Sequence, residues 1–84
     1  KYRGIKMSRK VFVEVNVKFD SEGRMIPLSI NWEDGRLFEI DKIIDIRKAA
    51  SLKAGGIGVR YTILTNRKQT YLWYEDPRWF VVGI

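Results

Sequence analysis

Residues 11–19 read Val11-Phe12-Val13-Glu14-Val15-Asn16-Val17-Lys18-Phe19, and this stretch decides the fold class. All its odd-numbered positions are apolar, whereas polar side chains hold most of the even-numbered ones. A period of two gives one apolar face only in an extended strand, because successive strand side chains point to opposite faces. The stretch therefore predicts a β-strand that buries its valines on one side.

The same alternation returns along the rest of the chain, and turn residues separate the runs. Pro27 has no backbone N–H, so its strand is expected at a sheet edge or beside a bulge. Asp34-Gly35 stands between two alternating runs, which predicts a hairpin with Gly35 at positive φ. Asn66-Arg67-Lys68 predicts a second tight turn. Further strands are expected over residues 25–32, 37–40, 59–65, 69–74 and 79–82, and the expected core residues are Val13, Val15, Ile30, Ile40, Ile63 and Leu72.

Residues 41–54 support two interpretations. Three apolar side chains, Ile43, Ile46 and Ala50, are spaced for one helix face, and Asp41 could cap such a helix. As a strand, the isoleucines at 44 and 46 continue the alternation from Ile40 and leave a long loop over residues 49–58. We favour the continued strand, because isoleucine-rich runs after a hairpin favour extension. A helix around residues 41–54, and with it an α+β fold, is the alternative.

The length of the chain limits it to one domain. A chain of 84 residues holds a single core, because two smaller pieces would bury too little surface. We expect a basic N-terminal tail over residues 1–10 and one domain over residues 11–84. Five to seven short strands with short turns in so small a domain predict a mostly-β, small antiparallel barrel.

Several features along this barrel resemble a known group of proteins. They are Trp32 ahead of Asp34-Gly35-Arg36, the run from Ile40 to Ile46, Gly55-Gly56 with Gly58 and Arg60-Tyr61, and the closing Trp79-Phe80-Val81. Their order over residues 11–82 resembles small bacterial proteins of uncharacterised function with an SH3-like β-barrel. The resemblance implies an SH3-like barrel and carries no activity with it. The chain lacks the aromatic motifs that line the polyproline groove of SH3 domains, so that function is not expected.

The composition argues against catalysis. Histidine and cysteine are both absent, which removes the commonest general base and the best thiol nucleophile and zinc ligand. We therefore expect no enzyme, no metal, no cofactor and no small-molecule substrate. The glycines at 55, 56 and 58 lack the Gly-Lys-Ser/Thr ending of a phosphate-binding loop and are interpreted as a hairpin or cap cluster. A cysteine-free domain without a long apolar run is expected in the cytoplasm and away from membranes.

The charges are unevenly distributed around a net charge of +6. Residues 11–45 hold eight acidic and four basic side chains, whereas residues 46–74 hold six basic and no acidic ones. Aromatic residues are interleaved with the bases in the second half. The candidate binding surface consists of Arg47, Lys48, Lys53, Arg60, Arg67, Lys68, Tyr71 and Trp73.

Two functions follow from this surface. Residues 69–74 are apolar on both faces, and a strand in a one-core domain has only one face to bury. We therefore expect a small interaction module that associates with itself, as a two-fold dimer, or with another protein. The alternative is a nucleic-acid-binding barrel, because basic groups neutralise phosphates and flat rings stack on bases.

Overall fold

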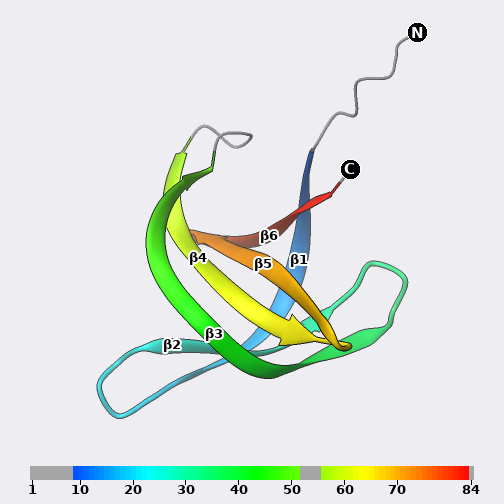
Figure 1. The fold of residues 1–84 in the computed structure, drawn as a ribbon, viewed down its shortest axis with the longest axis horizontal. Helices are drawn as coiled ribbons and strands as arrows, with labels where there is room; N and C mark the ends of the chain where they lie inside the picture. Colours follow the sequence, from blue (N-terminus) through cyan, green and yellow to red (C-terminus); the bar gives the residue numbers. More distant parts are fainter. Residues whose placement is uncertain (1–8, 52–55, 84) are drawn as a thin grey trace, which may run out of the picture.

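The computed structural model describes residues 9–51 and 56–83, which form six antiparallel strands. They are β1 (Arg9–Phe19), β2 (Met25–Asn31), β3 (Leu37–Ser51), β4 (Gly56–Thr65), β5 (Lys68–Glu75) and β6 (Arg78–Gly83). Each strand pairs with the next in sequence, and β6 pairs with β1, so the sheet closes into a barrel (Figure 1). The prediction of a small, mostly-β antiparallel barrel is confirmed.

The barrel interior holds the apolar side chains that the alternation selected. The buried cluster is Ile30, Tyr61, Ile63, Leu72 and Trp79, and the partly buried side chains around it include Val13, Val15 and Ile40. All six expected core residues therefore lie in this cluster or against it. Arg9 and Lys10, which we assigned to a tail, are the first residues of β1 and pair with Gly83 and Val82.

The turns follow the predicted chemistry. Gly35 has a φ of 93°, and its N–H donates to the carbonyl of Trp32 at 2.9 Å. Between β4 and β5, Asn66 and Arg67 both have positive φ, at 50° and 62°, while their neighbours Thr65 and Lys68 pair directly. Two central residues with positive φ are typical of the primed turns that match strand twist. The tight turns at both places are confirmed.

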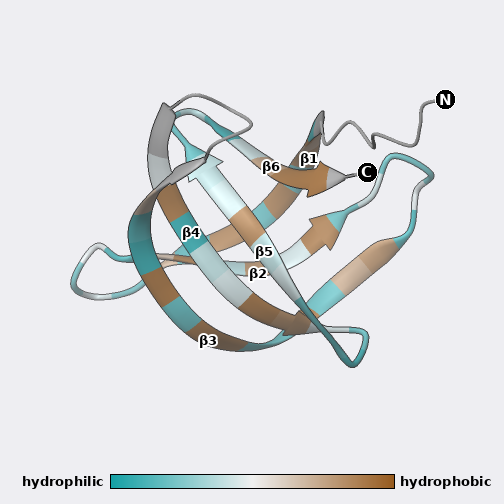
Figure 2. Cartoon of the chain, turned by 45° about the horizontal axis from the view of Figure 1, so that its top comes forward, coloured by the Kyte–Doolittle hydropathy of each residue, from teal (hydrophilic) through white to brown (hydrophobic). Residues whose placement is uncertain are grey.

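β3 differs most from its expected form. The strand runs to Ser51 and the described part of the chain contains no helix, so the helix alternative for residues 41–54 is wrong. The expected loop over residues 49–58 is also wrong at both ends, because Ala49–Ser51 pair with Gly56–Gly58. The pairing register with β4 shifts once between Ile40 and Lys42 and again between Ile43 and Asp45. Figure 2 shows hydrophobic and hydrophilic residues alternating along this strand.

The register shifts change which side chains of β3 are buried. Each places an extra residue of β3 against β4, which bends the strand and reverses the alternation beyond it. The first shift brings Ile43 to the core side, and the second leaves Ile44 at the bulge, where it is exposed. Ile46 pairs with the core residue Tyr61 but stays half exposed, because β2 does not pair with this part of β3. Simple alternation from Ile40 could not predict this change.

β2 contains the bulge that Pro27 predicted. Asn16 pairs with Ser29 and Val17 with Pro27, so Leu28 is the extra residue. Leu28 is consequently exposed and Pro27 is buried, although simple alternation from the core residue Ile30 would bury Leu28 and expose Pro27. Among residues 9–51 and 56–83, the structure has no helix long and apolar enough to cross a membrane.

Candidate interaction surfaces

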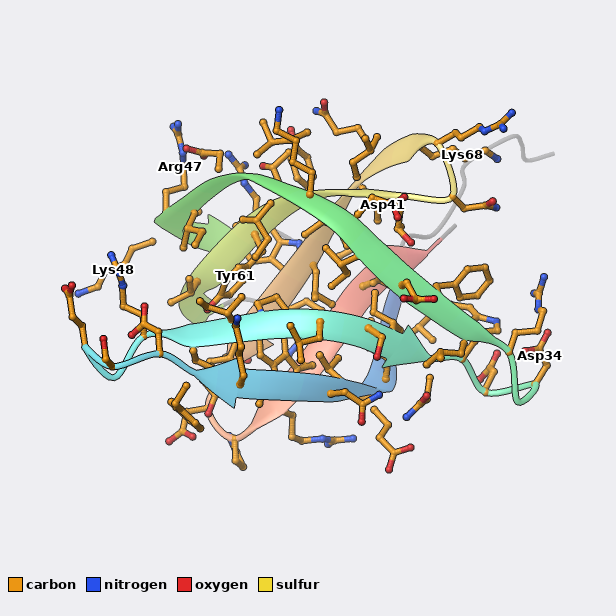
Figure 3. All side chains as sticks on the ribbon, turned by 90° about the horizontal axis from the view of Figure 1, so that it is seen from below. Asp34, Asp41, Arg47, Lys48, Tyr61 and Lys68 are labelled. Atoms are coloured by element: carbon orange, nitrogen blue, oxygen red, sulfur yellow. The ribbon has the colours of Figure 1, made fainter. Side chains whose placement is uncertain are left out.

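The predicted binding residues do not form one surface. Arg47, Arg60 and Trp73 are successive partners across β3, β4 and β5. Arg67 lies in the β4–β5 turn and Lys68 follows it, at the opposite end of the barrel from Arg47 (Figure 3). Lys48 is exposed on β3, and Lys53 lies outside the described residues.

Trp73 is covered within its own chain. Its neighbour Leu72 is in the barrel core, so Trp73 faces the outside of the barrel. There its ring stacks on Phe80, with 6.0 Å between centroids and 3° between planes, and Phe12 meets Phe80 edge-on. The exposed fraction is 7% for Trp73 and 0% for Phe80. Trp73 is therefore unavailable to stack on a base or to fill a partner surface.

The cations around this outer aromatic layer stack on rings. The guanidinium of Arg60 lies 4.5 Å from the ring centre of Tyr71, and that of Arg78 lies 3.3 Å from the ring centre of Phe12. Tyr71 and Phe12 themselves are exposed. Such pairs are worth about 0.5–1 kcal/mol at exposed sites. The two arginine–ring pairs lie on an outer surface formed by β1, β4, β5 and β6, where cations and flat rings alternate.

Arg47 forms an ion pair with a residue of its own strand, Asp45. Its Nε donates to Asp45 Oδ2 at 2.6 Å. This hydrogen bond is the main reason that the pKa of Asp45 lies below its usual value, and the same contact raises the pKa of Arg47. Asp45 and Arg47 thus form an ion pair on the outer face of β3, which neutralises part of the expected basic surface.

A second surface, which we name the free β3 edge, consists of the side of β3 away from β4 over Asp41–Ser51. β2 pairs with β3 only through Ser29–Asn31 and Leu37–Glu39. This pairing ends where the Leu28 bulge and Pro27 begin, because proline has no N–H to donate. Within the described part of the chain, the remainder of β3 therefore has a strand partner only in β4.

Tyr61 spans the space between β2 and β3 at this edge (Figure 3). Its hydroxyl donates to the Met25 carbonyl at 2.8 Å, a carbonyl on the part of β2 that β3 does not reach. Burial raises the pKa of this hydroxyl. Ile46, the partner of Tyr61 across the strands, keeps 50% of its surface exposed. The free β3 edge therefore carries exposed apolar side chains beside unpaired backbone.

The far end of the barrel has a shallow depression of about 450 Å³. Trp32 and Phe38 meet edge-on in its wall at 6.5 Å between ring centres, and Lys68 and Arg36 also line it. The guanidinium of Arg36 is bound to Asp34 at 2.6 Å and lies over the Phe38 ring. Of the two cations that line the depression, Lys68 is the one that the tight turn presents next to the aromatic wall.

The free β3 edge was not among the sequence-predicted sites. The residue of the sequence that could have indicated it is Pro27, which interrupts β2 and leaves the facing part of β3 without a partner in β2.

The part of the chain that the structure describes brings together no group of three or more acidic, histidine or cysteine side chains with metal-site geometry. Comparisons with models of protein families, with curated proteins and with solved structures found no match. The residues of the chain itself are therefore the basis for assigning its function.

Proposed function

We propose that the protein is a small, non-catalytic interaction module that binds a protein strand along the free β3 edge. The observation that carries this proposal is a strand with a partner on one side only, next to exposed isoleucines. An exposed strand edge offers a row of N–H and C=O groups to an added strand. Peptide-binding domains use this mode, in which the backbone supplies affinity and alternate side chains supply specificity.

The geometry of β3 limits the proposed site to its second half. From Asp45 to Ser51 the strand pairs residue by residue with β4, without a bulge. A regular strand can accept a further strand on its other side, whereas the bulges near Asp41 and Ile44 turn the edge away. The corresponding edge of β2 is unsuited to this role because Pro27 cannot donate. The cysteine-free composition favours a reducing compartment such as the cytoplasm.

The proposal is tested by backbone NMR on the isotope-labelled full chain. We expect the amide signals of Asp45–Ser51 to shift or broaden as protein concentration rises or when extract of the source cells is added. Ile46→Lys should abolish the response, because it places a flexible charge in the apolar part of the edge. Phe19→Lys changes an equally apolar, exposed position at the end of β1 and should preserve it. Unchanged β3 signals in both experiments would overturn the proposal.

A second candidate function is nucleic-acid binding on the outer face. It is favoured by the arginines stacked on exposed rings, Arg60 on Tyr71 and Arg78 on Phe12. Arginine planes and aromatic faces are the groups on which bases of single strands stack. Against it stand the ion pair of Arg47 with Asp45, the ion pair of Lys10 with Glu75, and the burial of Trp73.

A titration distinguishes the second candidate from the first. Single-stranded and duplex DNA and RNA are added to the full chain at low salt, and the same titration is run on Arg60→Gln and Arg78→Gln. A nucleic-acid function requires affinity that falls steeply with salt, because bound phosphates release counterions. It also requires weaker binding by both variants. Equal binding by all three proteins, or none below about 100 μM, excludes this surface as a nucleic-acid site.

A further inference from the structure

We propose that the strand bound at the free β3 edge is β3 of a second copy of this chain, in an antiparallel pair with Ile46 on the two-fold axis. This inference rests on the proposed function, since it names the partner of the same edge. The pair would extend the barrel sheet of one copy into that of the other. An interface of this kind is isologous, with the same residues contributed by both copies.

The register follows from geometry and charge. With a two-fold axis normal to the sheet, a residue and its copy point to the same face of the sheet. Residues that lie opposite each other also share a face, so odd-numbered residues face odd-numbered ones and even-numbered residues face even-numbered ones. One residue must therefore lie opposite its own copy. If that residue is Asp45, Arg47 or Lys48, a charge faces an identical charge, which destabilises a cross-strand pair. If it is Ile46, Asp45 faces Arg47 of the second copy and Arg47 faces Asp45 of the second copy. Of these four registers, only the one centred on Ile46 places unlike charges opposite each other.

The side chains at this centre already have suitable positions. Asp45 and Arg47 are on one face of β3 and are bound to each other at 2.6 Å. Pairing two such strands makes a ring of four alternating charges on the outer face. On the other face the two Ile46 side chains, each half exposed in the single chain, would cover each other beside Tyr61. The charges set the register, while burial of the isoleucines contributes to affinity.

The absence of cysteine from the chain permits a direct test of the axis. Residues directly opposite in an antiparallel pair have Cα atoms about 4.5–5.5 Å apart, within the range that a disulfide spans. Ile46→Cys should therefore form a covalent dimer under mild oxidation. Phe19→Cys is the control, because its side chain is the more exposed at 67% and lies away from the axis. Cross-linking at the same rate in both variants, or in neither, would contradict the proposed register.

A charge exchange tests the cross-strand pairs independently. Asp45→Arg gives four cations at the axis and Arg47→Asp gives four anions, so each single variant should sediment as a monomer at concentrations where the original chain is a dimer. An equimolar mixture of the two should recover the dimer, because every cation then faces an anion. The double variant, with both changes in one chain, should also be a dimer.

The outcomes separate the two proposals. If the original chain stays monomeric and its β3 signals respond only to cell extract, the second copy is the wrong partner while strand binding at β3 stands. If the mixture fails to recover a dimer that the single variants lost, the register centred on Ile46 is wrong. If β3 responds to neither concentration nor extract, both proposals fail.

Discussion

The Tyr61 hydroxyl joins β4 to Met25, on the part of β2 that does not pair with β3. Tyr61→Phe keeps the ring in the core and removes only the bond to the Met25 carbonyl. We expect the free energy of unfolding to fall by about 0.5–1.5 kcal/mol, measured by urea denaturation. The control is Tyr74→Phe, whose hydroxyl binds the exposed Asp76 and should matter less. Equal losses in both variants would show that the Tyr61 bond has no special role.

Gly58 is required by the close approach of β4 to β5. A Cβ at this position would lie 2.7 Å from the carbonyl oxygen of Tyr74, a backbone atom that cannot move alone. We expect Gly58→Ala to lower the free energy of unfolding by about 1–3 kcal/mol, because overpacking forces the backbone to shift. A thermal midpoint equal to that of the original chain would contradict this contact. Gly56 and Gly58 lie in β4 as strand residues, so the expectation of a hairpin or cap cluster is wrong for these two glycines.

At the scale of elements, the backbone of the β4–β5 turn is strained at Arg67, and glycine at this position would relieve the strain. Arg67 has a φ of 62°, a conformation that costs a residue with a Cβ roughly 1–2 kcal/mol. Arg67→Gly removes this strain, and we expect it to raise the free energy of unfolding by about 1 kcal/mol. Arg67→Ala is the matched control, because it removes the same charge and keeps the Cβ. If both variants gain equally, the charge and not the backbone is responsible.

The elements also show where alternation stops being a sufficient guide. β1 was predicted nearly to its bounds because its pattern continues without interruption. β3 was only partly predicted, since its first bulge reverses the faces, its second restores them, and no local signal marks the bulges at Asp41 and Ile44. A bulge is decided by how two bent strands pair, which depends on the neighbouring strand and on closure of the barrel.

At the scale of the whole molecule, three aspartates with lowered pKa values contribute to how stability responds to acid. The pKa values of Asp20 and Asp34 are lowered chiefly by backbone N–H donors of Arg24 and Arg36, and that of Asp45 chiefly by the Arg47 side chain. Because the folded pKa values are lowered, this stability is present above the unfolded values near 3.8 and is lost as pH falls through the folded values.

This linkage gives a prediction for thermal unfolding. We expect the thermal midpoint to fall as the solution is acidified below the usual aspartate pKa. Asp20→Asn should flatten that dependence, because the amide cannot gain the proton that weakens the original turn. An acid profile unchanged by Asp20→Asn would show that this carboxylate does not contribute. The proposed dimer should dissociate over the same interval, since protonation of Asp45 removes its cross-strand pairs.

The sequence by itself determined the class of fold, the turns and most of the core. These depend on short-range features, namely the period of two and the turn residues Asp34-Gly35 and Asn66-Arg67. The tertiary structure decided how the predicted binding residues are distributed. It buried Trp73 under Phe80, placed Lys68 away from Arg47, and left the edge of β3 without a partner in β2. The physical reason is that burial and pairing depend on which strands become neighbours when the barrel closes, and spacing along the chain does not specify this.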